Sequence, residues 1–370
     1  MRYIDEFRNP QIAARLAALI ADAAKDGRHY RLMEFCGGHT HTIHRYGIPS
    51  LLPSNVEMIH GPGCPVCVLP IARIDNAIAL AKMPNVILCS YGDMLRVPGS
   101  HQQSLLQAKA NGADVRMIYS ANDVLAIARD NPAHEVIFFA IGFETTTPPT
   151  AAILKVAQSL QLSNLSVFCN HVLTPVAMDS LLQHQMGTDT GIALDGFVGP
   201  AHVSIVTGSQ AYEAVSNRYQ KPIVIAGFEP LDILHAIWML VQQINQGRCE
   251  VEIQYTRAVT REGSAIAQTL MEEVFELRPT FEWRGLGYIP HSALQIKSIY
   301  ASFDAEKKFQ LPESTGIEHR QCDCGAILRG IKKPKDCRLF AKVCTPQNPL
   351  GACMVSSEGA CAAVYAYGRE

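Results

Sequence analysis

The stretch RLMEFCGGHTH, residues 31–41, contains the unit on which the fold is built. Residues 31–35 form a short, mainly apolar run that is typical of a buried strand, and glycine and histidine follow soon after it. A strand-like run followed by glycine and a polar or ionisable residue recurs at GPGC (61–64), GFETT (142–146) and GFEP (227–230). Ligands of open α/β sheets bind beyond the carboxyl ends of the strands, so these motifs predict a shared cleft.

Strand-like runs alternate with helical periodicity along most of the chain. The predicted strands are 31–35, 56–59, 86–90, 115–119, 136–141, 166–169, 196–198 and 223–226. The predicted helices are 9–24, 71–82, 103–111, 151–160, 174–185, 231–246 and 263–275. Alternation of this kind predicts parallel sheets covered by helices.

The predicted elements fall into two sets, with a boundary near residues 130–134. We therefore predict two doubly wound, Rossmann-like α/β domains that face a cleft, residues 28–132 and 133–248. A helix within residues 1–27 would pack on another domain. From Cys249 the pattern changes, and residues 249–370 are expected to form a small, Cys-rich, mainly helical third domain.

Composition limits the classes of function. The chain has 370 residues, of which 48% are hydrophobic and 18% charged, with a net charge of −2. This balance argues against a nucleic-acid partner, and the Lys332, Lys333 and Lys335 cluster is interpreted as solvated surface. We expect no secretory signal, no membrane span and a cytoplasmic location, where thiols stay reduced. The twelve cysteines then indicate metal binding or redox chemistry.

Half of the cysteines crowd into the tail. They are Cys322, Cys324, Cys337, Cys344, Cys353 and Cys361. Four thiolates suit zinc or an iron–sulfur cluster, and the lack of a C-x2-C pair in the tail favours the cluster. The alternative is that several are buried free thiols, since cysteine is a small apolar residue. The spacing does not decide which four would bind.

The N-terminal half carries separate thiols. Cys64 and Cys67 form a C-x-x-C motif that can close a disulfide. Half of a zinc knuckle is the competing interpretation, although no second C-x-x-C completes it. Cys36, with His39 and His41, is a possible soft metal site that His44 could join. A tight turn with exposed histidines is the alternative there.

The remaining candidates are isolated polar residues and thiols. Glu144 and Glu229 each follow Gly-Phe, and His202 lies in GPAHVS (199–204). All three are candidates for acid–base or hydrogen-bonding roles, with helix capping or solvation as the alternative. Cys89 and Cys169 lie in strand patterns and are interpreted as core thiols.

Taken together, the motifs resemble the HypD family of [NiFe]-hydrogenase maturation proteins over essentially the whole chain. The motifs that carry the resemblance are CGGHTH (36–41), GPGCPVC (61–67), GFETT (142–146), GFEPLD (227–232) and SSEGACAA (356–363). One position departs from the family, because Ala201 stands where its members usually have glycine. If the family's glycine has a positive φ at this position, the backbone of Ala201 would be strained.

The resemblance implies two similar α/β domains and a third that holds a [4Fe–4S] cluster. It implies that a HypC-type small chaperone and a HypE-type cyanide donor assemble the Fe(CN)2CO fragment on this protein. It places the iron-holding thiol on Cys36 and the redox pair on Cys64 and Cys67. The implied cluster ligands are Cys324, Cys337, Cys344 and Cys361, which leaves Cys322 and Cys353 outside the pattern.

We expect the Cys36 sulfur to lie in the cleft and the C-x-x-C pair to lie near the tail thiols. The leading hypothesis is an assembly scaffold and redox centre, for which we infer no simple turnover reaction. An iron–sulfur-dependent thiol–disulfide oxidoreductase is one alternative, but it gives Cys36, His39 and His41 no role. A zinc-stabilised interaction module is the other.

Overall fold

The protein folds around two parallel sheets. The computed structural model describes residues 5–186, 193–312, 314 and 316–368. Sheet A has the order β2-β1-β7-β8-β9, and sheet B has the order β4-β3-β5-β6. The strands of sheet A are β1 (Tyr30–Glu34), β2 (Val56–His60), β7 (Gly196–Pro200), β8 (Ile223–Ala226) and β9 (Val251–Ile253). Those of sheet B are β3 (Val86–Tyr91), β4 (Asp114–Ile118), β5 (Glu135–Gly142) and β6 (Leu165–His171).

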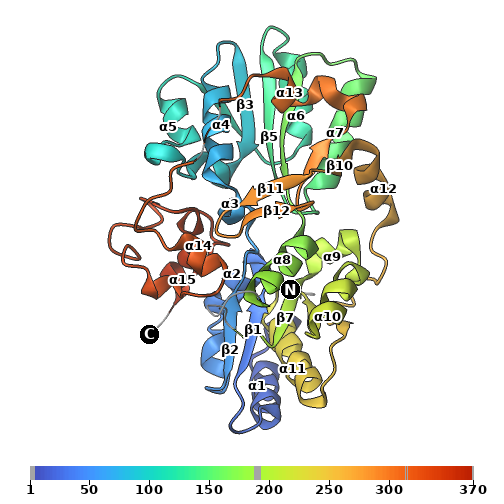
Figure 1. Ribbon diagram of the computed structural model, residues 1–370, viewed down its shortest axis with the longest axis vertical. Coiled ribbons are helices and arrows are strands. Elements are labelled where there is room, and N and C mark those ends of the chain that lie inside the picture. The colour runs from blue at the N-terminus through green and yellow to red at the C-terminus, as the bar shows by residue number, and fades with distance from the viewer. Residues whose placement is uncertain (1–4, 187–192, 313, 315, 369–370) are drawn as a thin grey trace.

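Helices surround both sheets (Figure 1). They are α1 (Pro10–Ala23), α2 (Gly37–Arg45), α3 (Pro65–Val68), α4 (Ile71–Ala81), α5 (Leu105–Ala110), α6 (Asn122–Asp130), α7 (Thr147–Ser159), α8 (Thr174–Met186), α9 (Ala201–Thr207), α10 (Glu213–Tyr219), α11 (Pro230–Gln246), α12 (Ala265–Val274), α13 (Ala305–Lys308), α14 (Cys324–Leu328) and α15 (Ala360–Tyr367). Helix α1 begins at the Asn9 cap and packs on α11, as expected of the N-terminal helix.

The grouping of the strands differs from the expected one. Strands β1 and β2 pair with β7 and β8, which lie more than a hundred residues later in the chain. Strand β3 pairs with β4 and β5 instead. The continuous ranges 28–132 and 133–248 therefore do not coincide with the two sheets. Strand β9, which had been assigned to the third domain, extends sheet A.

The positions of the individual elements agree well with expectation. All eight predicted strands and the seven predicted helices are present, with ends that differ by a few residues. Within the α/β part, helices α2, α3, α6, α9 and α10 were not predicted, and neither were the small antiparallel pairs β10–β13 and β11–β12. These four strands are β10 (Phe275–Leu277), β11 (Thr280–Trp283), β12 (Gly287–Pro290) and β13 (Leu294–Ile296).

The cysteine-rich tail lies beside the region between the two sheets. Figure 1 shows the sheets at opposite ends of the molecule, with the red C-terminal segment against its middle. The tail consists of the short helices α14 and α15 and of irregular chain. Its hydrophobic residues share a core with β1, α3 and α4, so the tail packs on the α/β part.

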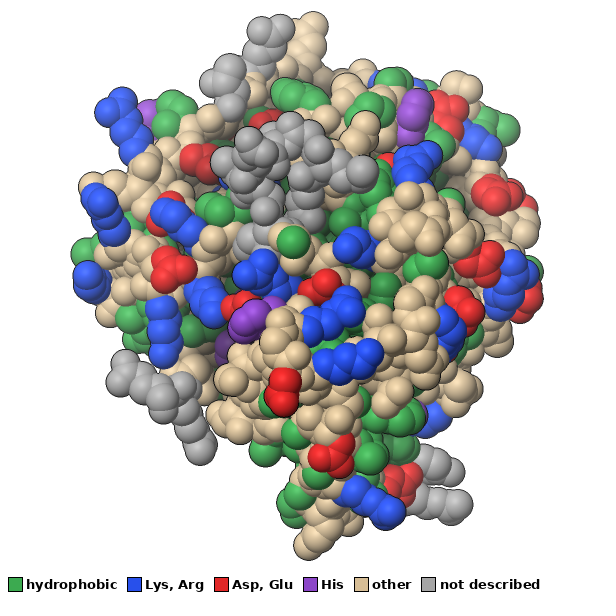
Figure 2. Space-filling model, turned by 60° about the horizontal axis from the view of Figure 1, so that its bottom comes forward, with side chains coloured by type: hydrophobic (Ala, Val, Ile, Leu, Met, Phe, Trp, Pro, Cys, Tyr) green, Lys and Arg blue, Asp and Glu red, His purple; other side chains and the backbone are tan. Residues whose placement is uncertain are grey.

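No helix of the described part of the chain combines the length and the apolar character needed to cross a membrane. On the face shown in Figure 2, Lys and Arg side chains lie interspersed with Asp and Glu. Cys89 and Cys169 are 0% and 1% exposed within β3 and β6, which confirms that they are core thiols.

Candidate functional site

The turn after β1 places Cys36 at the N-cap of α2. The preceding carboxylate, Glu34, is fully buried and accepts a hydrogen bond from the Cys36 amide at 2.9 Å. Gly63, from the turn after β2, packs against the same residue, and a Cβ there would lie 2.2 Å from the Cys36 nitrogen. A glycine is needed at this position, since any side chain would collide with the backbone of Cys36.

The Cys36 thiol is buried beside a histidine. Its Sγ lies 3.5 Å from Nδ1 of His202, which is near the start of α9. Burial, with a smaller contribution from His39, lowers the pKa of His202 to about 4, so this imidazole is neutral at pH 7. Burial, followed by Glu358 and Glu34, raises the pKa of Cys36 well above its usual value. Ala201 begins α9 without a positive φ, so it is not strained.

The three histidines of the CGGHTH region point in different directions. His39 is buried, and its Nε2 lies 3.1 Å from the carbonyl oxygens of Ala226 and Gly227. His41 Nδ1 lies 3.3 Å from the Ser357 carbonyl oxygen. His44 Nε2 lies 2.8 Å from Nε2 of His60. The structure therefore places His202, and neither His41 nor His44, in hydrogen-bonding contact with the Cys36 thiol.

Glu144 and Glu229 lie apart from each other. The Glu144 carboxylate is 1% exposed and accepts hydrogen bonds from the Thr174 amide and hydroxyl at 2.8 and 2.9 Å. Burial raises the pKa of Glu144 to about 7. Glu229 caps α11 and forms an ion pair with Arg8 at 2.5 Å. Both glutamates therefore have structural partners, and neither contacts the Cys36 thiol directly.

The two sheets nevertheless approach each other at this site. The buried Tyr212 hydroxyl is close enough to both Glu144 and Cys36 for their charges to raise its pKa, after burial as the main cause. Glu144 follows β5 of sheet B, and Cys36 follows β1 of sheet A. Residues that follow these two strands therefore lie within electrostatic range of the same buried hydroxyl.

A hollow of about 290 Å³ opens beside the Cys36 turn. It is lined by Arg8, Gly38, Phe228, Glu229 and Glu358, among others. A Cβ at Gly38 would lie 2.9 Å from the Phe228 ring and 3.7 Å from the Cys36 sulfur. The ring and the thiol are thus close to the same glycine, and the hollow provides a polar approach to the region of Cys36.

The C-x-x-C pair lies at the short helix α3, with Cys64 as its N-cap. Cys64 and Cys67 are 4% and 1% exposed. Burial, followed by the Cys353 and Cys64 thiols, raises the pKa of Cys67 well above its usual value. The Cys67 sulfur also lies 3.8 Å from the Ala352 carbonyl oxygen. The expectation that the pair lies near the tail thiols is therefore confirmed.

The six tail cysteines line one small apolar cavity. Its other lining residues include Ile327, Leu339, Phe340 and Met354. Cys353 has hydrogen-bonding contacts to the thiols of Cys324, Cys361 and Cys67. Cys322 contacts Cys324. Cys353 thus joins the C-x-x-C pair to the tail thiols.

The donor set of this cavity fits an iron–sulfur cluster. Soft thiolates inside apolar walls are the ligands that such clusters use. Gly351 lies against the Cys322 sulfur, and a Cβ at this position would be 2.5 Å from that atom. The absence of a side chain therefore leaves room beside the thiols. Among the described residues, no group of three His, Cys, Asp or Glu is arranged to hold a single metal ion. An iron–sulfur cluster does not need several ligands around one point, because each of its iron atoms is bound by a different cysteine.

Sequence reasoning did not single out three groups near Cys36. They are Glu34, Tyr212 and Glu358. Glu34 gave one signal, a carboxylate at the end of a mainly apolar strand. Glu358 lies within the SSEGACAA motif, and its Cβ is 2.5 Å from an ideal Cβ at Gly37. Tyr212 gave no signal, because its position near Cys36 depends on how segments that are distant in the sequence pack together.

Comparison with known proteins places these features in context. A family model described as "HypD: Hydrogenase formation hypA family" matches residues 11–368. The chain is 62% identical to the "Hydrogenase expression/formation protein HupD" of Azotobacter chroococcum mcd 1, covering 100% of this chain and 98% of that protein. It is 61% identical to the "Hydrogenase maturation factor HypD" of Azotobacter vinelandii, with the same coverage. Identity to the protein of that name from Escherichia coli (strain K12) is 46%, covering 100% and 99%.

Proposed function

Because the chain belongs to the HypD family of hydrogenase maturation factors, we propose that it is a scaffold and redox centre for assembling the Fe(CN)2CO fragment of the [NiFe]-hydrogenase active site. The iron of that fragment is the cargo, and Cys36 would hold it as a thiolate. A HypC-type chaperone and a HypE-type cyanide donor would act on the same site. We place this work in the cytoplasm, where thiols stay reduced.

The observation that best supports the proposal is that the thiols of the two halves of the chain form one connected group. Cys353 contacts Cys67 of the C-x-x-C pair and also two thiols that we propose as cluster ligands, Cys324 and Cys361. Two thiol sets with separate functions would not have to lie in contact with each other. Here the C-x-x-C pair and the tail thiols do lie in contact. The contact therefore supports a shared redox role.

The proposed roles follow from the surroundings of each thiol. Cys36 must lose its proton to bind iron, and binding of the metal ion favours that loss. Nδ1 of His202, at 3.5 Å, is placed to accept a hydrogen bond from the thiol before the proton leaves. Cys324, Cys337, Cys344 and Cys361 would hold a [4Fe–4S] cluster, which when bound supplies one-electron transfer. Cys36 is 3% exposed, so its surroundings would limit the access of water to the cargo.

Electron balance defines the role of the C-x-x-C pair. Reduction of a Cys64–Cys67 disulfide breaks one S–S bond, takes up two electrons and two protons, and leaves two thiols. The electrons would come one at a time from a low-potential electron-transfer protein. The reverse reaction re-forms the S–S bond and releases two electrons and two protons, so the pair can store one two-electron equivalent.

The alternative of a general thiol–disulfide oxidoreductase receives less support. Such an enzyme must present a sulfur to disulfides of other proteins, whereas Cys64 and Cys67 are 4% and 1% exposed. The alternative of a zinc-stabilised interaction module does not explain why Cys353 contacts Cys67.

Anaerobic purification with iron, sulfide and zinc analysis tests the proposal. The native protein should contain about four iron atoms and about four sulfides per chain. Cys324→Ala should lose most of this iron, whereas Cys353→Ala should keep it. Cys64→Ala should keep the iron but fail to restore hydrogenase activity in a strain that lacks its own HypD-type protein.

Cys249→Ala is the matched control, because this thiol is half-buried and bonded to Gln220 away from the other cysteines. It should retain both the iron and the maturation activity. Retention of iron in Cys324→Ala, or its loss in Cys353→Ala, would refute the ligand set. Zinc in place of iron would refute the redox centre, and normal maturation by Cys64→Ala would refute the role of the pair.

A further inference from the structure

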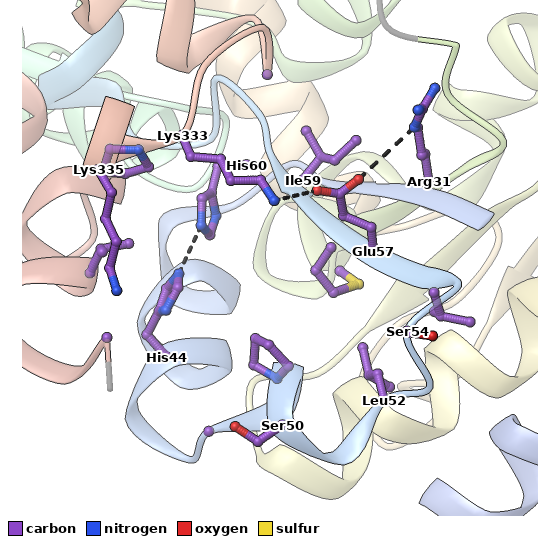
Figure 3. A pocket seen from close by; sticks show the side chains of 18 of the residues that line it. Arg31, His44, Ser50, Leu52, Ser54, Glu57, Ile59, His60, Lys333 and Lys335 are labelled. Atoms are coloured by element: carbon purple, nitrogen blue, oxygen red, sulfur yellow. Dashed lines mark hydrogen bonds and ion pairs between the residues drawn. The ribbon is translucent and has the colours of Figure 1, made fainter. Parts of the chain in front are cut away.

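A wide groove of about 1370 Å³ lies along strand β2 (Figure 3), and Cys36 is not among the residues that line it. All five residues of β2 line it. Its opposite wall is the tail segment 330–336, and Gly330 closes one end, where a Cβ would lie 2.6 Å from Ile59. The groove is thus built from an edge of sheet A and from a tail segment that the proposed function does not use.

Strand β2 is an edge strand whose outer backbone groups face this groove. Within the described residues it pairs with β1 alone. The Asn55 carbonyl and the Gly61 amide bond to β1, at 2.7 and 2.9 Å. Because alternate residues of a strand face opposite neighbours, Met58 and His60 direct their N–H and C=O groups away from β1. The His60 carbonyl oxygen lies beside Gly330, 3.7 Å from where a Cβ of that residue would be, whereas the Met58 groups and the His60 amide face the groove. The Val56 amide is already bonded to Pro53.

The rim of the groove carries an excess of positive charge. Its Lys and Arg residues are Arg31, Arg45, Lys332, Lys333 and Lys335. Its acidic residues are Glu57 and Asp336. Burial, followed by His60 and Lys335, lowers the pKa of His44 to about 3, so His44 adds no charge at pH 7.

Glu57 on strand β2 shows that the basic rim of the groove attracts carboxylates. Glu57 lies between Lys333 at 2.6 Å and Arg31 at 4.0 Å, as Figure 3 shows. Lys333 is 73% exposed in this pair, so a carboxylate of another chain could take the place of Glu57 at little cost. Lys335 has no ion-pair partner among the described residues, which leaves its charge available.

From the edge strand and the basic rim together, we infer that the groove binds an extended acidic segment of a partner protein, which adds to sheet A beside β2. Main-chain hydrogen bonds to Met58 and His60 would hold the segment as a strand. Acidic side chains on it would face Lys333 and Lys335. Edge strands need such cover, because unpaired backbone groups otherwise recruit unwanted strands. This inference does not depend on the proposed function.

A labelled octapeptide of alternating Glu and Val, measured by fluorescence anisotropy, tests the inference. It should bind the native protein, and a Lys–Val octapeptide should not. Lys335→Glu should weaken binding several-fold and reduce its salt dependence. Met58→Pro should abolish binding, because it removes an outward N–H while leaving the bonds to β1 in place. Met58→Leu, which keeps the N–H and the volume, should bind like the native protein.

Two further peptides separate strand addition from simple charge attraction without altering the protein. One carries N-methyl groups on its Glu residues and the other on its Val residues. A strand presents alternate amides to one neighbour, so one of the two should lose binding and the other should keep it. Equal binding of the two N-methylated peptides, or binding of the Lys–Val peptide as tight as that of the Glu–Val peptide, would overturn the inference.

Discussion

At the scale of single residues, the site combines buried charges with buried thiols. Glu34 and Glu358 both raise the pKa of the Cys36 thiol, in addition to burial. An anionic environment of this kind disfavours a free thiolate, so the thiolate is expected chiefly when iron is bound. A protonated thiol is a poor nucleophile, so Cys36 is protected from reaction while no metal is bound.

Glu144 gives a prediction at this scale, because its buried carboxyl has a pKa of about 7 instead of 4.5. Between these values the folded protein holds a proton that the unfolded chain has released, so stability falls as pH rises through this window. Glu144→Gln removes this effect. Relative to the native protein, the variant should gain about 2–3 kcal/mol in unfolding free energy between pH 5 and pH 8.

Urea unfolding at the two pH values measures this gain. The exposed Glu276→Gln serves as the control for the loss of one carboxylate, and the Glu144→Gln gain should exceed its effect. A Glu144→Gln difference that stays the same at the two pH values would show that the Glu144 carboxyl does not titrate in this range.

At the scale of elements, the turns after β1 and β2 form one unit. Gly61 and Gly63 pack on the end of β1, where a Cβ would lie 2.6 Å from the Glu34 carbonyl and 2.2 Å from the Cys36 nitrogen. The amide of Gly37 also donates to the Gly63 carbonyl at 2.9 Å. The GPG motif therefore sets the position of the Cys36 backbone.

Gly63→Ala should displace Cys36, since the added methyl group meets backbone and not a flexible side chain. We expect a loss of roughly 1–3 kcal/mol in unfolding free energy. We also expect loss of the bound cargo, with the tail iron retained. Gly92→Ala is the control, because its Cβ would meet the end of the Met117 side chain, which can move. Cargo binding in Gly63→Ala equal to that of the control would contradict this view of the turn.

The sequence predicted the elements better than it predicted the directions of their side chains. The CGGHTH motif predicts a metal site that gathers Cys36, His39 and His41, with a tight turn as the alternative, but residues 37–45 form helix α2. Residues two apart on a helix point to opposite sides, so His39 faces β8 and His41 faces the tail. Two glycines begin this helix because Glu358 and Phe228 leave no room for side chains. Those neighbours are distant in sequence, so periodicity could not reveal them.

At the scale of the whole molecule, the chain leaves sheet A after β2, builds sheet B, and returns with β7. Hydrophobic patterns identify strands but do not say which strands pair, so the two sheets could not be divided correctly from sequence order. The positions of Cys36, His202 and the Gly227 turn on one sheet follow from this return. The connection between Cys67 and Cys353 likewise depends on how the tail docks.

The central claim is that Cys36 holds the iron cargo while the tail thiols hold a separate cluster. Infrared spectroscopy tests it most directly, on the protein purified anaerobically in complex with its HypC-type chaperone. The native complex should show the stretching bands of bound cyanide and carbon monoxide. Cys36→Ala should lose these bands and the ability to support hydrogenase maturation, while it keeps the tail iron and the fold. Cys36→Ala protein that still showed the bands would contradict the account.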